Sequence, residues 1–229
     1  MIVRDGIYRM YEQQEDIFYY LTVYNENYSM PAMPQAKGDA DSINAQIEMG
    51  ILRGAYCYRR SEEKTGQVIN LLSSGSIMQQ ALSAKLQLQA LGYRVNVWSV
   101  TSYNELYRDA VATDRWNRLH PEDPSKQCYL EKLFSEEEGV FVSASDYMSS
   151  LGNSIARWMP KAYTVLGTDG YGLSEAREDL RDYFEISDKF IVQAALQSLY
   201  QQGAITSELL QQQLAPLGIN ADKIDPASI

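Results

Sequence analysis

Residues 68–92 read V-I-N-L-L-S-S-G-S-I-M-Q-Q-A-L-S-A-K-L-Q-L-Q-A-L-G, and this stretch decides the fold class of the chain. Its first five residues form a short apolar run, which is typical of a strand buried on both faces. Apolar residues then recur at helical spacing on one stripe: Ile77, Ala81, Ala84, Leu88 and Leu91. Gly92 is suited to end this helix, because glycine readily adopts the left-handed backbone that often follows a helix. The stretch therefore predicts one strand–helix unit.

The same alternation continues on both sides of this unit. Further strands are predicted at 17–24, 54–59, 95–100, 140–142 and 163–166, and helices at 5–14, 42–53, 126–134, 147–158, 175–184, 188–201 and 206–214. Another helix is predicted to begin after Ser102, with Glu105 three residues later as in a capping box. Short apolar strands that alternate with helices predict an α/β fold, a three-layer open sheet that is mostly parallel.

A charged stretch rich in small residues, S-E-E-K-T-G at 61–66, separates this regular region from the first part of the chain. Such composition is typical of a link between compact units. We therefore expect a domain boundary there, with residues 1–60 before it and residues 66–229 after it.

Composition limits the classes of function. The net charge of −10 over 229 residues disfavours a nucleic-acid partner. No apolar run approaches the roughly 20 residues that span a bilayer, and the start lacks a secretory signal pattern, so we expect no membrane partner and a cytoplasmic location. Cys57, Cys128 and the single histidine form no zinc-binding spacing and no disulfide framework. Both thiols are expected to be free and at least half-buried.

Small polar residues follow the predicted strands at 73–76, 101–102, 143–146 and 167–170. At the carboxyl ends of parallel strands such residues either bind an anion or cap the next helix, and capping is the commoner role. The motif G-T-D-G-Y-G at 167–172 fits neither the dinucleotide fingerprint nor a phosphate loop. Ser174 is expected to cap the next helix, and Glu175 and Glu178 would repel an anion. We therefore predict a structural turn built on glycine.

The motif and its surroundings, V-L-G-T-D-G-Y-G-L-S-E-A-R-E-D-L-R-D-Y-F-E-I at 165–186, resemble homodimeric pyruvate dehydrogenases. These are the thiamine diphosphate-dependent first components of the pyruvate dehydrogenase complex. Further matching stretches are D-G-I-Y-R-M-Y (5–11), F-Y-Y-L-T-V-Y-N-E-N-Y-S-M-P-A-M-P (18–34), W-S-V-T-S-Y-N-E-L-Y-R-D (98–109) and D-R-W-N-R-L-H-P (114–121). They follow one another in the family's order over nearly the whole chain.

The resemblance implies the architecture of the transketolase superfamily. Residues 1–60 would be the tail of the middle, pyrimidine-binding domain, and residues 66–229 would be the carboxyl-terminal domain that supports the dimer. The full-length family enzyme uses thiamine diphosphate and Mg to decarboxylate pyruvate oxidatively. It passes the acetyl group to a lipoyl domain of the acyltransferase component. The implied partners are the remainder of the subunit, a second copy and that acyltransferase.

The family's cofactor motif is not present in this sequence. The diphosphate–magnesium pattern G-D-G followed later by Asn does not occur, and G-D-A at 38–40 has no predicted strand before it. The glutamate that activates the cofactor in the family lies in an earlier part of the middle domain. We expect this chain alone to bind no thiamine diphosphate and to be inactive.

Arg4 precedes D-G at a position that the resemblance places at the rim of the substrate pocket, where some members have histidine. An arginine there could pair with a substrate carboxylate but would not shuttle protons near neutral pH. A solvated arginine at a helix end is the alternative interpretation. His120 is expected to play a structural, hydrogen-bonding role. Residues 34–45 are longer than the usual family loop and are predicted to be a mobile surface insertion.

A second class of function stays open, a stand-alone interaction or scaffold module derived from the same family. Tyrosines crowd the first quarter of the chain, at positions 19, 20, 24, 28, 56 and 58. Aromatic residues with polar tips are favoured at interfaces, although they also build local cores. If neighbouring strands are missing, an apolar patch around residues 19–28 is expected to be exposed.

Overall fold

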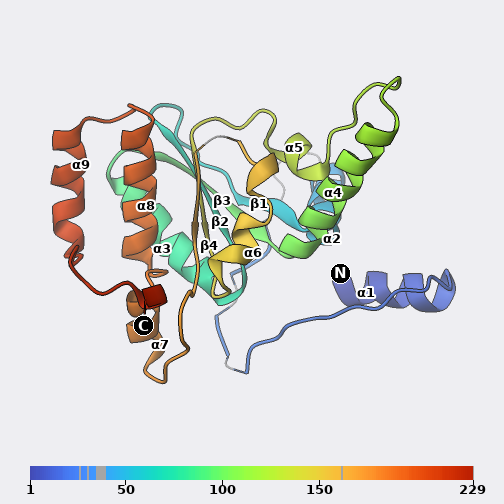
Figure 1. Ribbon diagram of the computed structural model, residues 1–229, viewed down its shortest axis with the longest axis horizontal. Helices are drawn as coiled ribbons and strands as arrows, with labels where there is room; N and C mark the ends of the chain where they lie inside the picture. The colour runs from blue at the N-terminus through green and yellow to red at the C-terminus, as the bar shows by residue number, and fades with distance from the viewer. Residues whose placement is uncertain (26, 30, 35–39, 161, 229) are drawn as a thin grey trace.

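A five-stranded sheet forms the centre of the molecule in the computed structural model, which describes residues 1–25, 27–29, 31–34, 40–160 and 162–228 (Figure 1). Its strands are β1 (Ala55–Arg59), β2 (Val68–Ser73), β3 (Arg94–Val100), β4 (Val140–Ala144) and β5 (Tyr163–Leu166), in the order β1-β3-β2-β4-β5. β2 pairs in parallel with β3 and β4, β4 pairs in parallel with β5, and only the edge strand β1 is antiparallel to its neighbour. The predicted mostly parallel sheet is confirmed.

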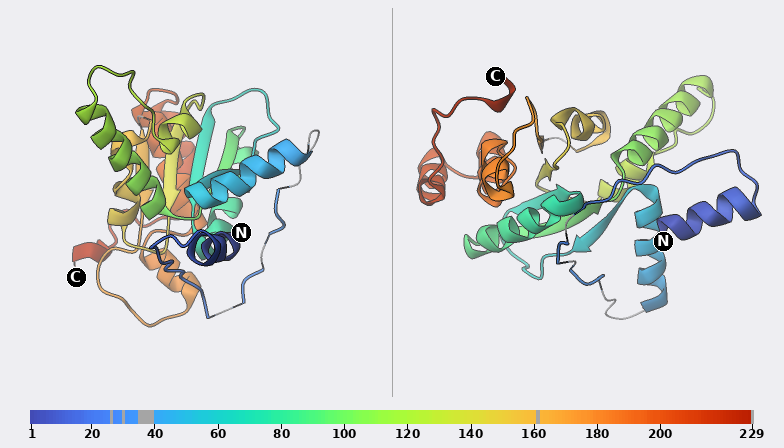
Figure 2. Two further views of the ribbon diagram at one scale, coloured as in Figure 1. Left: turned by 90° about the vertical axis from the view of Figure 1, so that its right-hand side faces the viewer. Right: turned by 90° about the horizontal axis from the view of Figure 1, so that it is seen from below.

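Helices cover both faces of this sheet (Figures 1 and 2). The helices are α1 (Ile2–Ile7, continued by a π-helical turn over Tyr8–Glu12), α2 (Ala40–Arg53), α3 (Met78–Ala90), α4 (Tyr103–Leu119), α5 (Tyr129–Phe134), α6 (Ser149–Asn153), α7 (Arg177–Tyr183), α8 (Asp188–Gln201) and α9 (Ser207–Leu214). α3 and α8 bury one apolar cluster on one face, and α4 and α5 bury a second cluster on the other. The predicted three-layer arrangement is therefore confirmed.

The central strands contribute to both clusters because successive side chains of a strand point to opposite faces. Every residue of β2 and of β4 is buried. Leu71 packs into the cluster under α3 and α8, whereas its neighbour Leu72 packs into the cluster under α4 and α5. This two-sided burial explains why the sequence shows continuous apolar runs here rather than an alternating pattern.

Several predicted helix ends are present in the structure. Gly92 follows α3 with a φ of 91°, and the N–H of Tyr93 donates to the carbonyl oxygen of Leu88. The Ser102 hydroxyl accepts from the N–H of Glu105 at the start of α4. At the other end of α4, Nδ1 of His120 lies 2.9 Å from the carbonyl oxygen of Trp116, and the two rings stack. The structural role expected of His120 is confirmed.

The strand predicted at 17–24 is wrong, because this segment is an extended chain that pairs with no strand in the described part of the protein. Phe18, Tyr20 and Val23 are 87%, 85% and 88% exposed. β-branched and aromatic residues favour a strand only where a neighbour completes the hydrogen bonds. In the described part of residues 19–28, where an exposed apolar patch was expected, the side chains of Tyr20, Leu21, Val23 and Tyr24 are exposed.

Three other boundaries differ from the prediction. Residues 147–158 form α6 and a separate 3-10 turn at Ala156–Trp158 rather than one helix. α7 is capped by Ala176 and begins at Arg177, so Ser174 is not its cap. Of the predicted insertion at 34–45, residues 35–39 lie outside the described residues, and the part from Ala40 onward is helical rather than a loop. No described helix is long and apolar enough to cross a membrane.

Both thiols are free, as expected: Cys128 is buried and Cys57 is half-buried. Burial raises the pKa of each thiol from 9 to about 11. We therefore expect iodoacetamide to alkylate the folded chain slowly at pH 8 and the urea-unfolded chain quickly, because only the thiolate reacts. Because the pKa of each thiol is higher in the folded state, the two thiols contribute fully to the free energy of unfolding below pH 9. This contribution is lost as the pH rises toward 11. Fast alkylation of both thiols in the folded chain, followed by mass spectrometry, would contradict this prediction.

Candidate functional site

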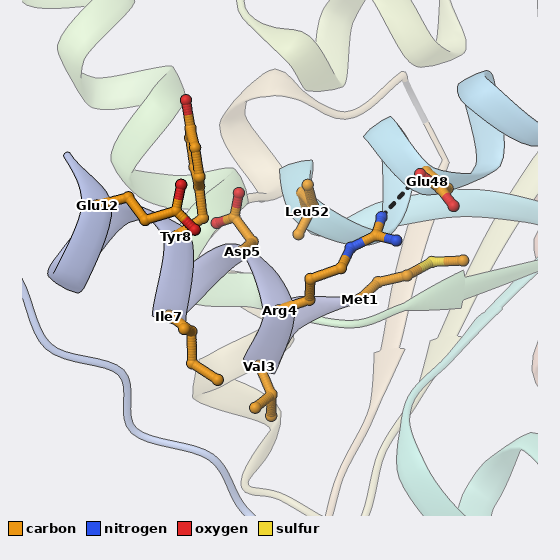
Figure 3. Close-up of a pocket in the computed structure, with 9 residues that line it drawn as sticks. All are labelled: Met1, Val3, Arg4, Asp5, Ile7, Tyr8, Glu12, Glu48 and Leu52. Atoms are coloured by element: carbon orange, nitrogen blue, oxygen red, sulfur yellow. Dashed lines mark hydrogen bonds and ion pairs between the residues drawn. The ribbon is translucent and has the colours of Figure 1, made fainter.

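An open groove of about 560 Å³ lies between α1 and α2, and it contains the candidate residue Arg4 (Figure 3). Nη2 of Arg4 donates to Oε2 of Glu48 at 3.2 Å. The two side chains are 75% and 44% exposed, so solvent screens this ion pair strongly. Arg4 can therefore leave Glu48 at little energetic cost and pair with another carboxylate.

The wall of this groove is held by a chain of polar contacts behind α1. Tyr19 donates from its hydroxyl to Oδ2 of Asp5 at 2.6 Å and accepts from Nη1 of Arg9 at 3.1 Å. Arg9 also donates to Glu15. Burial, followed by the bond to Asp5, raises the pKa of Tyr19, so the phenol stays a donor. These contacts position α1 and leave the Arg4 guanidinium exposed at the open groove.

The small polar residues predicted at the carboxyl ends of the strands do lie together, but they bind mainly to one another. Ser74 donates to Ser145, and Ser76 donates to Oδ2 of Asp146 at 3.3 Å. The hydroxyl of Thr168 donates to the carbonyl oxygen of Asp146 at 2.6 Å. These side chains tie one loop to the next, and the bonds among them occupy most of their hydrogen-bonding groups.

The glycine-rich motif has the structural role predicted for it. Oδ1 of Asp169 accepts from the N–H of Ser149, the first residue of α6, at 2.9 Å. Gly167 packs directly on the backbone of Ser149, and Gly170 has a φ of 101° beside the carbonyl oxygen of Pro226. The turn therefore joins the end of β5 to the start of α6 through close backbone contacts.

A second cavity, of about 290 Å³, lies at this edge of the sheet, where Tyr24 and Tyr28 meet α7. Polar or charged and apolar side chains both line it: Tyr24, Tyr28, Ser76, Ile77, Asp146, Thr168, Arg177, Leu180, Arg181, Phe184 and Ile186. The sequence analysis did not single out Arg177 and Arg181. Their i, i+4 spacing, which places both on one face of a helix, was the available signal.

The described residues of this chain do not by themselves fit a thiamine diphosphate–magnesium group. Among the described residues, no three His, Cys, Asp or Glu side chains lie close enough together to hold a metal ion. The carboxylates of the open groove include Glu48, which faces Arg4, and Asp5, which accepts from Tyr19. A diphosphate–Mg²⁺ group needs converging oxygen ligands, which this arrangement does not provide.

The mostly parallel sheet and the helices on both of its faces define a three-layer α/β domain. The chain belongs to the family of the transketolase-like TK C-terminal domain, which matches residues 54–187. Residues 1–31 match the pyruvate dehydrogenase E1 component middle domain. The resemblance found in the sequence is thereby confirmed.

The chain is also similar to curated proteins named pyruvate dehydrogenase E1 component. The chain is 40% identical over 228 residues to the pyruvate dehydrogenase E1 component of Pseudomonas aeruginosa, a match that covers 99% of this chain and 25% of the relative. It is 38% identical over 229 residues to that of Escherichia coli K12, again covering 99% of this chain but 24% of the relative. The chain thus spans about a quarter of the length of the curated relatives it matches.

Solved structures of transketolases are more distant. The enzyme of Campylobacter jejuni matches with a TM-score of 0.42 and 21% identity, over 63% of this chain and 18% of that chain. A Pichia stipitis transketolase, in complex with xylulose 5-phosphate, matches with a TM-score of 0.46 and 18% identity, over 68% of this chain and 19% of that chain.

Proposed function

We propose that this chain is the carboxyl-terminal part of a pyruvate dehydrogenase E1 component. Its full-length form would decarboxylate pyruvate oxidatively with thiamine diphosphate and Mg, and would pass the acetyl group to a lipoyl carrier. Residues 1–60 would complete the middle domain, with their last strand, β1, pairing at the edge of the sheet of the carboxyl-terminal domain, which residues 66–229 would form. The names and the coverage of the relatives support this proposal.

The exposed apolar side chains of the first 24 residues support this proposal. Apolar side chains of α1 and its continuation are exposed: Val3 is 59%, Ile7 is 52% and Tyr11 is 72% exposed. Phe18, Tyr20 and Val23 of the extended segment are exposed as well. Many exposed apolar side chains within one short part of a chain are typical of an interface whose other side belongs to another chain or segment. A portion cut from a middle domain would expose such a face.

The same proposal assigns the chain its partners and its location. It would act in the cytoplasm with the rest of the subunit and with a second copy as a homodimer, and the acyltransferase with its lipoyl domains would take the acetyl group. Alone, the chain would support fold and dimer and would be inactive. Arg4 would lie at the rim of the substrate pocket, where its exposed guanidinium is free to exchange Glu48 for a substrate carboxylate.

Reconstitution tests this proposal. We expect the purified chain alone to show no pyruvate-dependent reduction of ferricyanide. Mixing it with the amino-terminal three quarters of the Pseudomonas aeruginosa relative, with thiamine diphosphate and Mg²⁺, is expected to restore that activity. The double variant Phe18→Ser/Val23→Ser should weaken assembly in light scattering, because it removes apolar contact area. A Leu86→Ser variant is the matched control, since Leu86 is 68% exposed in the C-terminal half of α3.

The reconstituted enzyme also tests the role of Arg4. In that assay Arg4→Gln should raise the KM for pyruvate by about tenfold, because it removes a charge-assisted contact to the carboxylate. Glu48→Gln removes the same ion pair but leaves the guanidinium, so it should leave KM unchanged. Equal KM values in both variants would contradict the assignment. A stable assembly that stays inactive, together with a defined partner from pull-down, would favour the scaffold module instead.

A further inference from the structure

The smaller cavity has an apolar floor and one cationic end. Ile77, Phe184 and Ile186 are buried beneath it, and Leu180 of α7 lines its side. The cationic end is formed by Arg177 and Arg181, whose guanidinium carbons lie 5.2 and 5.8 Å from the centre of the Tyr28 ring. A pocket of this composition suits a ligand with an apolar body and a single negatively charged end.

Arg181 has bonding capacity left over. Its Nη2 donates to the hydroxyl of Ser76 at 3.4 Å and to that of Tyr28 at 3.5 Å, both near the long limit for a hydrogen bond. Within the described part of the chain, Arg181 makes no ion pair with a carboxylate. A half-buried guanidinium with only long bonds to neutral hydroxyls would gain strongly from a carboxylate ligand.

Hydrogen bonds to Asp146 hold Tyr24 and Ser76 in place in the wall of the cavity. Oδ2 of Asp146 accepts from the hydroxyl of Tyr24 at 2.7 Å and from that of Ser76 at 3.3 Å. Burial and the bond to Asp146 raise the pKa of Tyr24 to about 12, so its phenol stays a donor. Tyr24 also lies directly over Gly75, where a Cβ would stand 2.0 Å from its hydroxyl oxygen. A ligand would therefore find a formed pocket and would order little chain on binding.

We propose that this cavity binds a small monocarboxylate with a short aliphatic tail. The carboxylate accepts from the guanidinium of Arg181, and the tail lies on Ile77, Leu180 and Phe184. Ser76 bonds both Arg181 and Asp146, so the Asp146 carboxylate lies at the same end of the cavity. Its charge disfavours a phosphate dianion more than a monocarboxylate. The site is separate from the groove at Arg4, and it does not depend on the proposed function.

Titration of the full chain with hexanoate tests the site, with backbone amide shifts in two-dimensional NMR as the readout. We expect a dissociation constant on the order of 1 mM, in keeping with so small a ligand, with the largest shifts at Ile77, Leu180 and Arg181. Hexanol, which lacks the charge, and inorganic phosphate, which lacks the tail, should each bind at least about tenfold more weakly.

Variants locate the contact. Arg181→Gln should weaken hexanoate binding at least about tenfold. Arg157→Gln is the matched control, because Arg157 is exposed and pairs with Asp114 on the far side of β5, and it should leave binding unchanged. If Arg181→Gln does not fold, Arg181→Lys keeps the charge without the planar fork and should still weaken binding by about threefold or more. Unchanged binding in the folded Arg181 variant, equal binding of hexanol, or no shifts with about 20 mM hexanoate would overturn the proposal.

Discussion

Replacing Trp98 with alanine is expected to lower the free energy of unfolding by about 4 kcal/mol. Trp98 lies on β3 at the centre of the cluster under α4 and α5, and its side chain is 1% exposed. Its ring contacts that of Phe134 edge to face at a centroid distance of 4.8 Å, and Phe134 in turn contacts Phe141 of β4. Truncation would leave a cavity that the rigid sheet on one side cannot fill.

The indole also takes part in a buried hydrogen-bond network. Its Nε1–H donates to Oδ1 of Asn70 at 3.1 Å, and Nδ2 of Asn96 donates to the same oxygen at 3.0 Å. After the substitution, Oδ1 of Asn70 would therefore still accept a hydrogen bond from Asn96. Because the amide is not left unpaired, most of the loss is assigned to the cavity rather than to an unsatisfied polar group.

Urea unfolding followed by circular dichroism measures this loss. Trp116→Ala is the matched control, because Trp116 is half-buried near the end of α4 and contacts mainly His120 and Lys126. It should cost about 1 kcal/mol. If the two substitutions proved equally costly, or if the midpoint for Trp98→Ala did not move, Trp98 would not be the centre of this cluster.

The parts of the fold that the sequence predicted are those in which a local pattern suffices. β2 and α3 were predicted to within about two residues, because an apolar run, a polar turn and a helical stripe lie within one short stretch. The strand predicted at 17–24 was wrong for the opposite reason. Its composition favours a strand, but the outcome depends on whether a neighbouring strand is present, and local composition does not encode that.

The candidate sites divide in the same way. Arg4 could be singled out from its motif, and the structure places it on an open groove beside Glu48. The second cavity could not be predicted, because Tyr24 and Tyr28, the turn before α3, the loop after β4 and α7 meet only in the folded chain. The charges of Arg177 and Arg181 are visible in the sequence. The Tyr28 ring that they contact and the apolar residue Ile77 lie far from them along the chain.

Gly167→Ala is expected to destabilise the chain by about 3 kcal/mol, because it places a methyl group where backbone already lies. A Cβ at this position would stand 2.3 Å from the nitrogen and 2.7 Å from the Cα of Ser149. Both are backbone atoms at the start of α6, and that N–H already donates to Oδ1 of Asp169. The clash cannot be relieved by a change of side-chain rotamer, so β5 and α6 would have to separate.

Gly172→Ala, five residues further along the same motif, is the matched control. A Cβ at Gly172 meets no atom within 4 Å, so this substitution should change stability by no more than about 0.5 kcal/mol. Thermal and urea unfolding of both variants separate a turn held by close backbone contact from a loop that merely contains glycine. If the motif were a flexible loop poised for a ligand, both substitutions would be equally mild. A large loss confined to Gly167 would instead locate the constraint at the junction of β5 and α6, where the motif brings two backbone segments into contact.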